Sequence, residues 1–301
     1  MQMRTLLFLL AACAHIEPPI SYTPGKYFHY SNLDYLNYQV QGHGPVTLVL
    51  LHGFGSSLHN WDDIRDAFDP NLYTVYSLDL KGFGFSSVPS NNSYSIKANA
   101  ELVTSFICAH QLSNFWLIGH SLGGGVSLYT HLMSQSSDHT PPNGMILISS
   151  AAYPTKLPFF ITYLRYPLVS RTAFAATSPE FKARYSLERM YNNPEIITDT
   201  LLWRYAAFMS SQKFPAFAGT ARDIVPGNID ELTQSYSSIM CPVLVIWGDN
   251  DPILPLESGL RLAAEIPLAN LEILPDCGHI PQEEYPEKTA QLILDFLSIH
   301  K

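Results

Sequence analysis

A serine between glycines is the residue of this chain whose surroundings most clearly suggest chemistry. Residues 119–123 read Gly-His-Ser-Leu-Gly and fit the G-x-S-x-G pattern, which places a nucleophilic serine on a sharp turn between a strand and a helix. The neighbouring sequence agrees, because a short apolar run (114–118) precedes the turn and helical spacing (126–133) follows it. A Cβ at either glycine would clash in so tight a turn. We therefore predict that Ser121 is a nucleophile.

An activated serine needs a base that takes its proton and a third group that orients the base. Among the eleven histidines of the chain, His279 is the candidate base. It follows a strand-like run (271–274) through a turn (275–278), and a helical pattern comes after it. Open parallel sheets form their ligand sites at the carboxyl ends of strands, so we expect His279 at such a site.

The acid is expected after the apolar run 243–247. The segment that follows, residues 248–255, contains two carboxylates, Asp249 and Asp251. Its beginning, Gly-Asp-Asn-Asp, is also strong turn composition, so each aspartate also fits a purely structural role.

With Ser121, Asp251 and His279 in this order, the chain resembles the α/β-hydrolase superfamily. Members with this turn carry the acid three residues after the glycine of a W-G-x-x-D-x-x-x-P pattern, which implies Asp251 and leaves Asp249 as the alternative. The resemblance extends from about Tyr35 to Ile299, apart from most of an insertion described below.

Two further segments carry the resemblance. Residues 52–55, His-Gly-Phe-Gly, match the H-G-x-G element of the family, and residues 79–86 match its D-x-x-G-x-G-x-S signature. The resemblance implies an oxyanion hole formed by the backbone N–H groups of Phe54 and Leu122. It assigns structural roles to three further side chains of the motifs, namely His52, His120 and Asp79.

The order of apolar runs indicates the elements that position these residues. Strand-like runs alternate with helical patterns, which predicts a doubly wound, mostly parallel, eight-stranded sheet of the α/β-hydrolase fold. The expected strands are 27–30, 35–40, 46–51, 73–80, 115–119, 145–149, 243–247 and 271–274. The expected helices are 61–68, 96–110, 122–133, 257–265 and 286–299.

Residues 152–232 interrupt this alternation. They contain no convincing buried strand, 14 aromatic residues, and nine Lys and Arg against seven Asp and Glu. The balance of +2 leaves −11 for the rest of the chain. We predict a helical lid inserted into a core formed by residues 27–151 and 233–301. The alternative is a packing embellishment without a role at the site.

Residues 1–26 are expected to be a signal and a tether. Arg4 precedes the apolar run 6–10, and Ala-Ala-Cys follows it, as at a signal-peptide cleavage point. Residues 10–13, Leu-Ala-Ala-Cys, resemble the bacterial lipobox, which implies lipidation at Cys13, a membrane anchor and a place in the bacterial cell envelope. The alternative is an apolar N-terminus on a cytoplasmic enzyme.

Composition bears on other partners and on cofactors. A net charge of −9 argues against nucleic acid as a partner, because phosphate binding needs a basic face. No metal-ligand spacing and no glycine-rich phosphate loop is found, so neither a metal nor a cofactor is expected. The cysteines other than the lipobox residue, Cys108, Cys241 and Cys277, are expected to be unpaired thiols.

These observations predict a serine hydrolase that cleaves a small carboxylic ester with an apolar portion. The first alternative is hydrolysis of a carbon–carbon bond in a ring-fission diketone acid, which similar lid-bearing enzymes perform with a lid arginine. Arg204 is the candidate for that contact with the substrate, although such enzymes tend to carry Trp after the catalytic histidine and this chain has Ile280. The second alternative is a non-catalytic binding protein with the same fold.

Overall fold

The computed structural model describes residues 21–89, 93–136 and 138–300. The expected signal and its Cys13 lie outside these residues. Within them, no helix is both long enough and apolar enough to span a membrane.

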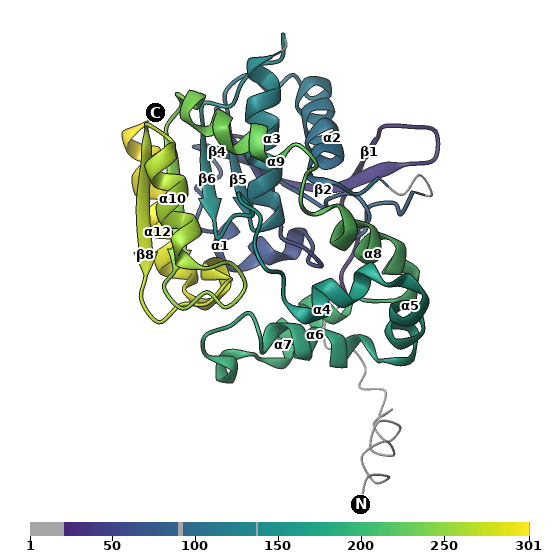
Figure 1. Cartoon of the computed structure of the whole chain (residues 1–301). Coiled ribbons are helices and arrows are strands. Elements are labelled where there is room, and N and C mark those ends of the chain that lie inside the picture. The colour runs from purple at the N-terminus through teal and green to yellow at the C-terminus, as the bar shows by residue number, and fades with distance from the viewer. Residues whose placement is uncertain (1–20, 90–92, 137, 301) are drawn as a thin grey trace, which may run out of the picture.

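The centre of the molecule is one eight-stranded sheet (Figure 1). The strand order is β1-β2-β4-β3-β5-β6-β7-β8. Strands β3 to β8 run parallel, whereas β2 pairs antiparallel with both β1 and β4. The strands are β1 (Lys26–His29), β2 (Tyr35–Gly42), β3 (Val46–Leu51), β4 (Tyr73–Leu78), β5 (Phe115–His120), β6 (Gly144–Ile148), β7 (Val243–Gly248) and β8 (Ala269–Leu274). The predicted sheet is confirmed.

The central strands are apolar throughout because both faces of the sheet are covered. Alternate residues of β3 point to opposite sides: Val49 and Leu51 belong to one core cluster, and Leu48 and Leu50 to the other. Strand β8 is an edge strand and is largely exposed, which explains why its apolar pattern is weaker than that of the central strands.

Helices cover the two faces of the sheet in separate layers (Figure 1). One core cluster joins the sheet to α2 (Ile96–Ala109), α3 (Leu122–Gln135) and α10 (Leu256–Glu265). The other cluster joins it to α1 (Asp62–Arg65) and α12 (Pro286–Ile299). A short helix, α11 (Pro281–Glu284), precedes α12.

Most predicted elements agree with the observed ones to within two residues, and two of the differences have a clear physical reason. The expected helix 61–68 begins earlier, as a 3-10 turn η1 (Leu58–Trp61), and α1 ends at Arg65. The start is earlier because the side chain of Ser57 caps the turn by accepting a hydrogen bond from the N–H of His59. The expected strand 73–80 ends at Leu78, because the next residue, Asp79, begins a tight turn that its own carboxylate stabilises.

Residues 149–242, all of them described, form helices and turns but no strand. Helices α4 to α8 gather on one side of the core (Figure 1). The helices of this segment are α4 (Phe159–Thr162), η2 (Tyr163–Arg165), α5 (Pro167–Ala176), α6 (Pro179–Leu187), η3 (Pro194–Ile196), α7 (Asp199–Ala206), η4 (Ser211–Lys213), α8 (Phe214–Asp223), α9 (Ile229–Gln234) and η5 (Ser235–Ser238). We call residues 152–232 the insertion. The three cysteines within the described ranges, Cys108, Cys241 and Cys277, are free thiols, as predicted.

Candidate active site

Ser121 lies at the sharp turn between β5 and α3, in a backbone conformation that non-glycine residues rarely adopt. Its φ is 50° and its ψ is −113°. The surroundings hold it there: its N–H donates to the carbonyl of Ile148 at 2.9 Å, and its own carbonyl accepts from Gly124 and Ala151. Strain of this kind, over-determined by neighbouring hydrogen bonds, is typical of functional sites.

The glycines of the turn are required by close packing. A Cβ on Gly123 would lie 2.0 Å from the carbonyl oxygen of Leu51, and one on Gly119 would lie 2.4 Å from that of Gly123. No side chain fits at such distances from backbone atoms, so only glycine allows α3 to begin this close to the sheet.

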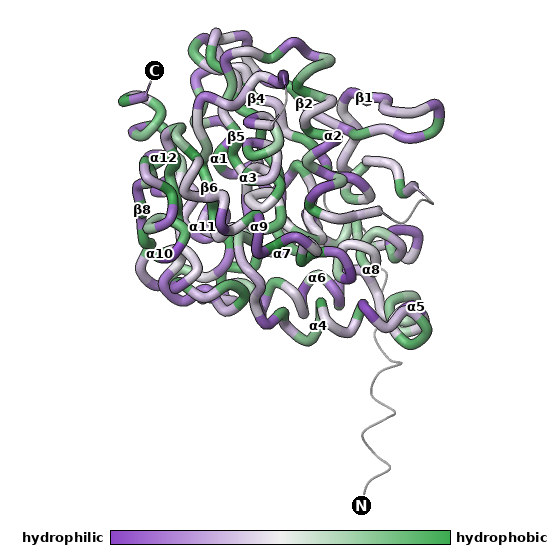
Figure 2. Tube along the Cα trace, turned by 45° about the horizontal axis from the view of Figure 1, so that its top comes forward, coloured by the Kyte–Doolittle hydropathy of each residue, from purple (hydrophilic) through white to green (hydrophobic). Residues whose placement is uncertain are grey.

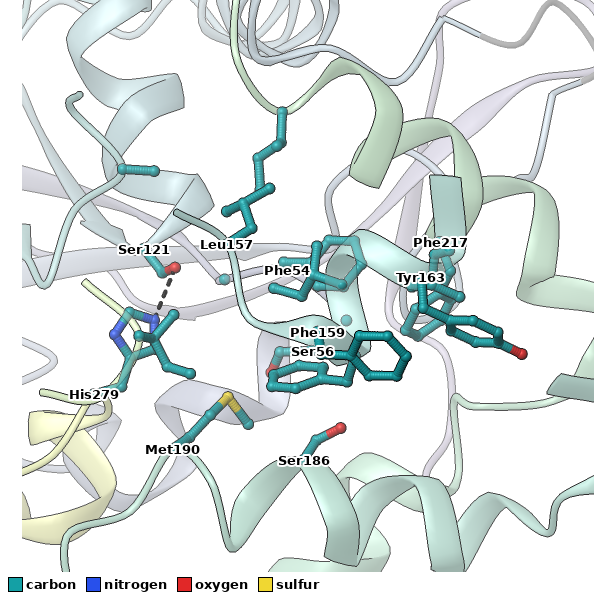
Figure 3. A pocket seen from close by; sticks show the side chains of 18 of the residues that line it. Phe54, Ser56, Ser121, Leu157, Phe159, Tyr163, Ser186, Met190, Phe217 and His279 are labelled. Carbon is teal, nitrogen blue, oxygen red and sulfur yellow. Dashed lines mark hydrogen bonds between the residues drawn. The ribbon is translucent and has the colours of Figure 1, made fainter. Parts of the chain in front are cut away.

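Three side chains from different loops form a hydrogen-bonded chain. The Oγ of Ser121 lies 3.0 Å from Nε2 of His279 (Figure 3). Nδ1 of His279 lies 2.8 Å from Oδ2 of Asp251. Because the Asp251 carboxylate accepts, Nδ1 carries the proton and Nε2 is free to accept from Ser121. The structure thus brings together the three residues predicted as nucleophile, base and acid.

Both partners of this chain are held by backbone groups. Oδ1 of Asp251 accepts the N–H groups of Ile253 and Leu254 at 2.8 and 2.9 Å, and the Asp251 side chain is fully buried. The N–H of His279 donates to the carbonyl of Met190 in the insertion at 2.7 Å. The imidazole is therefore oriented from the core and from the insertion at once.

His120 supports the histidine loop rather than the reacting atoms. Its Nε2 donates to the carbonyl of His279 at 2.9 Å. Burial holds the pKa of His120 well below its usual value, and the nearby His279 lowers it further. The ring therefore stays neutral and places no second positive charge beside His279.

The two groups predicted as oxyanion donors lie near Ser121. Phe54 and Ser121 line the same cavity, and Leu122 is the first residue of α3. Among the described residues, nothing accepts a hydrogen bond from the N–H of Phe54 or of Leu122. His52 fixes this loop, since its Nδ1 donates to the carbonyl of Gly53 at 2.7 Å and its Nε2 accepts the N–H of Leu80 at 3.0 Å.

The remaining aspartates of the motifs have structural contacts. Asp249 accepts a long hydrogen bond, 3.4 Å, from the N–H of Cys277 and does not contact His279. Asp79 accepts the N–H groups of Leu58 and Phe85 at 2.7 and 2.8 Å, as expected for a residue that shapes a turn.

The structure places Arg204, the candidate for a contact with the substrate, outside the lining of the cavity beside Ser121. Its guanidinium donates to both carboxylate oxygens of Asp63, at 2.5 and 2.8 Å, and to Glu283 at 3.1 Å. Arg204 is buried and is not among the residues that line the cavity beside Ser121. Its charge is paired with the carboxylates of Asp63 and Glu283.

Glu283 and Glu284, which no sequence motif marks as functional, join the insertion to the histidine loop. Glu283 accepts from the hydroxyls of Tyr191 and Tyr205, at 2.5 and 2.9 Å. Burial raises the pKa of Glu283, whereas its contact with Arg204 lowers it. Glu284 accepts the N–H groups of Gly278 and Asn192, both at 2.9 Å. The only sequence signal was two adjacent carboxylates just after His279.

A cavity of about 350 Å³ lies between the core and the insertion, with Ser121 and His279 in its wall (Figure 3). Its lining is mostly apolar and aromatic. Representative residues are Phe54 and Leu254 from the core, and Leu157, Phe159, Phe174 and Phe181 from the insertion. No three His, Cys, Asp or Glu side chains group as metal ligands anywhere in the described part of the chain.

Comparisons with known proteins agree with this architecture. A family model described as alpha/beta hydrolase fold matches residues 46–286. The chain is 28% identical over 285 residues to YugF of Bacillus subtilis (strain 168), an uncharacterized hydrolase, with 88% of this chain and 94% of that protein covered.

It is 25% identical over 278 residues to the 2-hydroxy-6-oxononadienedioate/2-hydroxy-6-oxononatrienedioate hydrolase of Escherichia coli (strain K12), with 85% and 88% covered. A similar solved structure is that of a thermophilic esterase from Thermogutta terrifontis. It has a TM-score of 0.75 and 24% identity, and the match covers 93% of this chain and 99% of that one.

Proposed function

The chain belongs to the alpha/beta hydrolase fold family, and from this premise we propose that it is a serine hydrolase that cleaves carboxylic esters with an apolar portion. The observation that carries the proposal is the hydrogen-bonded chain from Ser121 through His279 to Asp251 in the wall of an apolar cavity. These are the parts that acyl transfer through a serine nucleophile requires.

In the first half of the proposed reaction, Oγ of Ser121 attacks the ester carbonyl while Nε2 of His279 takes its proton. Asp251 keeps the proton of Nδ1 in place and stabilises the imidazolium that forms. The tetrahedral intermediate then expels the alcohol, which receives the proton from His279, and an acyl-enzyme on Ser121 remains.

In the second half, water loses a proton to His279 and attacks the acyl-enzyme. The second tetrahedral intermediate releases the carboxylic acid, and His279 returns its proton to Oγ of Ser121. The N–H groups of Phe54 and Leu122 would stabilise the oxyanion in both halves, each worth about 3 kcal/mol of the barrier. Their lack of partners among the described residues supports this role.

The apolar lining of the cavity supports an ester with an apolar acyl or alcohol part, because burying such a chain is favourable by about 0.8 kcal/mol per CH₂ group. The similarity to an esterase is consistent with this choice. We propose that the insertion acts as a lid over the cavity, since it contributes most of the apolar wall.

Carbon–carbon bond hydrolysis is the second candidate, and the similarity to the Escherichia coli hydrolase favours it. The pairing of Arg204 with Asp63 and Glu283 counts against it, because that arginine is not available to an acid group. Two assays separate ester hydrolysis from carbon–carbon bond hydrolysis. The rates of the native protein and of Arg204→Ala are measured with p-nitrophenyl butyrate and with a ring-fission substrate. Selective loss of the second activity in the variant would reverse our ranking.

The proposal is tested with a fluorophosphonate probe, which labels activated serines. We expect labelling at Ser121 and hydrolysis of p-nitrophenyl butyrate, with Ser121→Ala unlabelled and its kcat lower by about 10⁴-fold or more. Equal labelling of the variant, or no labelling of the native protein, would leave the non-catalytic alternative. A series of esters of graded acyl length then defines the substrate.

We further propose that Cys13 is lipidated and anchors the protein in the bacterial cell envelope, on the strength of the sequence pattern at residues 6–13. Labelling of cells with tritiated palmitate tests this. We expect label on the native protein and none on Cys13→Ser, and label on both would contradict it.

A further inference from the structure

Large apolar side chains are exposed on α4 to α6 of the insertion. Soluble proteins seldom leave such side chains clustered in water unless something covers them. The exposed fractions are 77% for Phe159, 66% for Tyr166, 91% for Leu168, 66% for Val169 and 53% for Phe181. We call these five residues the apolar face.

Contacts between the helices join the elements that carry these residues. The ring of Phe159 stacks on that of Tyr163, with centroids 6.1 Å apart, and the hydroxyl of Tyr163 donates to the carbonyl of Ser170 in α5. On the other side, the ring of Tyr185 contacts those of Phe160 and Phe181. Figure 2 shows the hydrophobic colouring along α5.

The apolar face adjoins the opening of the cavity. Phe159 and Phe181 are both largely exposed and also line the cavity that contains Ser121. These two side chains therefore connect the apolar face with the cavity that contains the nucleophile.

The charge around the apolar face is opposite to that of the whole protein. Residues 154–177 contain Lys156, Arg165 and Arg171 and no acidic residue, and the charges of Glu180 and Lys182, which flank Phe181, offset each other, whereas the chain has a net charge of −9. Lys156 and Arg171 are exposed. A surface that combines apolar and basic side chains is attracted to anionic lipid headgroups, and the acidic remainder is repelled by them.

We propose that the apolar face docks on an anionic lipid bilayer with the cavity opening toward it, so that the apolar ester enters from the lipid. The bilayer is favoured over a second copy of the chain, because a symmetric dimer would place the same three cations against one another. The route of the ester rests on the proposed function, whereas the docking does not.

Tryptophan fluorescence tests the docking. The four native tryptophans, Trp61, Trp116, Trp203 and Trp247, are buried, so a tryptophan placed at Leu168 is the exposed one. The full chain carrying Cys13→Ser and Leu168→Trp is mixed with vesicles that contain phosphatidylglycerol and brominated acyl chains. The matched control carries Leu33→Trp, a position 85% exposed between β1 and β2.

We expect quenching and a blue shift for Leu168→Trp but not for Leu33→Trp. Replacing phosphatidylglycerol with phosphatidylcholine should weaken the binding at least about ten-fold, as should Arg171→Glu. Equal quenching at both positions, or equal binding to neutral vesicles, would overturn the proposal. A blue shift that depends on protein concentration without vesicles would assign the face to a second copy instead.

Failure of the docking and failure of the proposed function are distinguishable. Leu168→Asp should no longer co-sediment with the vesicles yet hydrolyse dissolved p-nitrophenyl butyrate at the native rate, because Leu168 does not line the cavity. Ser121→Ala should dock on vesicles as the native protein does and hydrolyse nothing. Slow hydrolysis of the dissolved ester by Leu168→Asp would show that the face serves the cavity and not a bilayer.

Discussion

At the scale of residues, Asp249 and Asp251 are two aspartates two positions apart that differ in burial and in hydrogen-bond partners. Asp251 is fully buried, accepts two backbone N–H groups through one oxygen and the His279 ring through the other. Asp249 is exposed and has one long contact to Cys277. The turn directs one side chain into the site and the other toward solvent.

This difference predicts opposite outcomes for the same substitution. Asp251→Asn should lower kcat for p-nitrophenyl butyrate by about 10⁴-fold, because an amide favours the wrong tautomer of His279. Asp249→Asn is the matched control and should keep nearly the native kcat. Steady-state kinetics on both variants give the answer, and a comparable loss in Asp249→Asn would refute the assignment of the acid.

At the scale of elements, the junction of β5 and α3 determines whether Ser121 can be presented at all. The strained serine is held by Ile148 and Ala151, which belong to β6 and the segment after it. The start of α3 lies against the end of β3 with no room for a side chain at Gly123. The nucleophile therefore depends on three neighbouring strands.

Gly123→Ala should lower the free energy of unfolding by more than about 3 kcal/mol, because its Cβ would overlap the carbonyl of Leu51. Gly227→Ala, where a Cβ meets nothing within 4 Å, should change it by less than about 0.5 kcal/mol. Urea unfolding measures both. A native-like stability for Gly123→Ala would mean that α3 can shift away from the sheet at little cost.

At the scale of the whole molecule, buried histidines couple stability to pH. Burial lowers the pKa of His131 to about 4, and it also lowers the pKa of His52 and His120. The unfolded chain binds protons near pH 6.5, so it binds more of them than the folded protein does between pH 6.5 and 4. The contribution of these histidines to the free energy of unfolding is therefore fully present above pH 6.5 and is lost as the pH falls toward 4. Glu283 and Glu284, whose pKa values burial raises, act in the opposite direction.

His131→Gln isolates one of these contributions. The native protein should lose about 2 kcal/mol more than the variant between pH 7 and pH 5, since the glutamine does not titrate. Urea unfolding at several pH values measures the slopes, and any packing change in the variant only adds a constant offset. Parallel slopes would show that His131 is protonated in the folded protein as readily as in the unfolded chain.

The order and type of the strands, the turn at Ser121 and the histidine after β8 were all predictable from the sequence. Each depends on short-range patterns: apolar runs, glycines at a tight turn, and loops at the ends of strands. The resemblance to a known family added Asp251, Phe54 and Leu122, which no local pattern distinguishes from their neighbours.

Only the tertiary structure decided the role of Arg204 and the shape of the cavity. Arg204 and Asp63 are 141 positions apart, and nothing in either neighbourhood indicates that they pair. Glu283 likewise joins the histidine loop to Tyr191 and Tyr205 across long sequence distances. Hydrophobic periodicity identifies which face of a helix or strand is buried but not the element that it packs against, because the hydrophobic effect is non-directional. The sequence alone therefore determined which atom is the candidate nucleophile, and the packing of the insertion on the core decided what surrounds it.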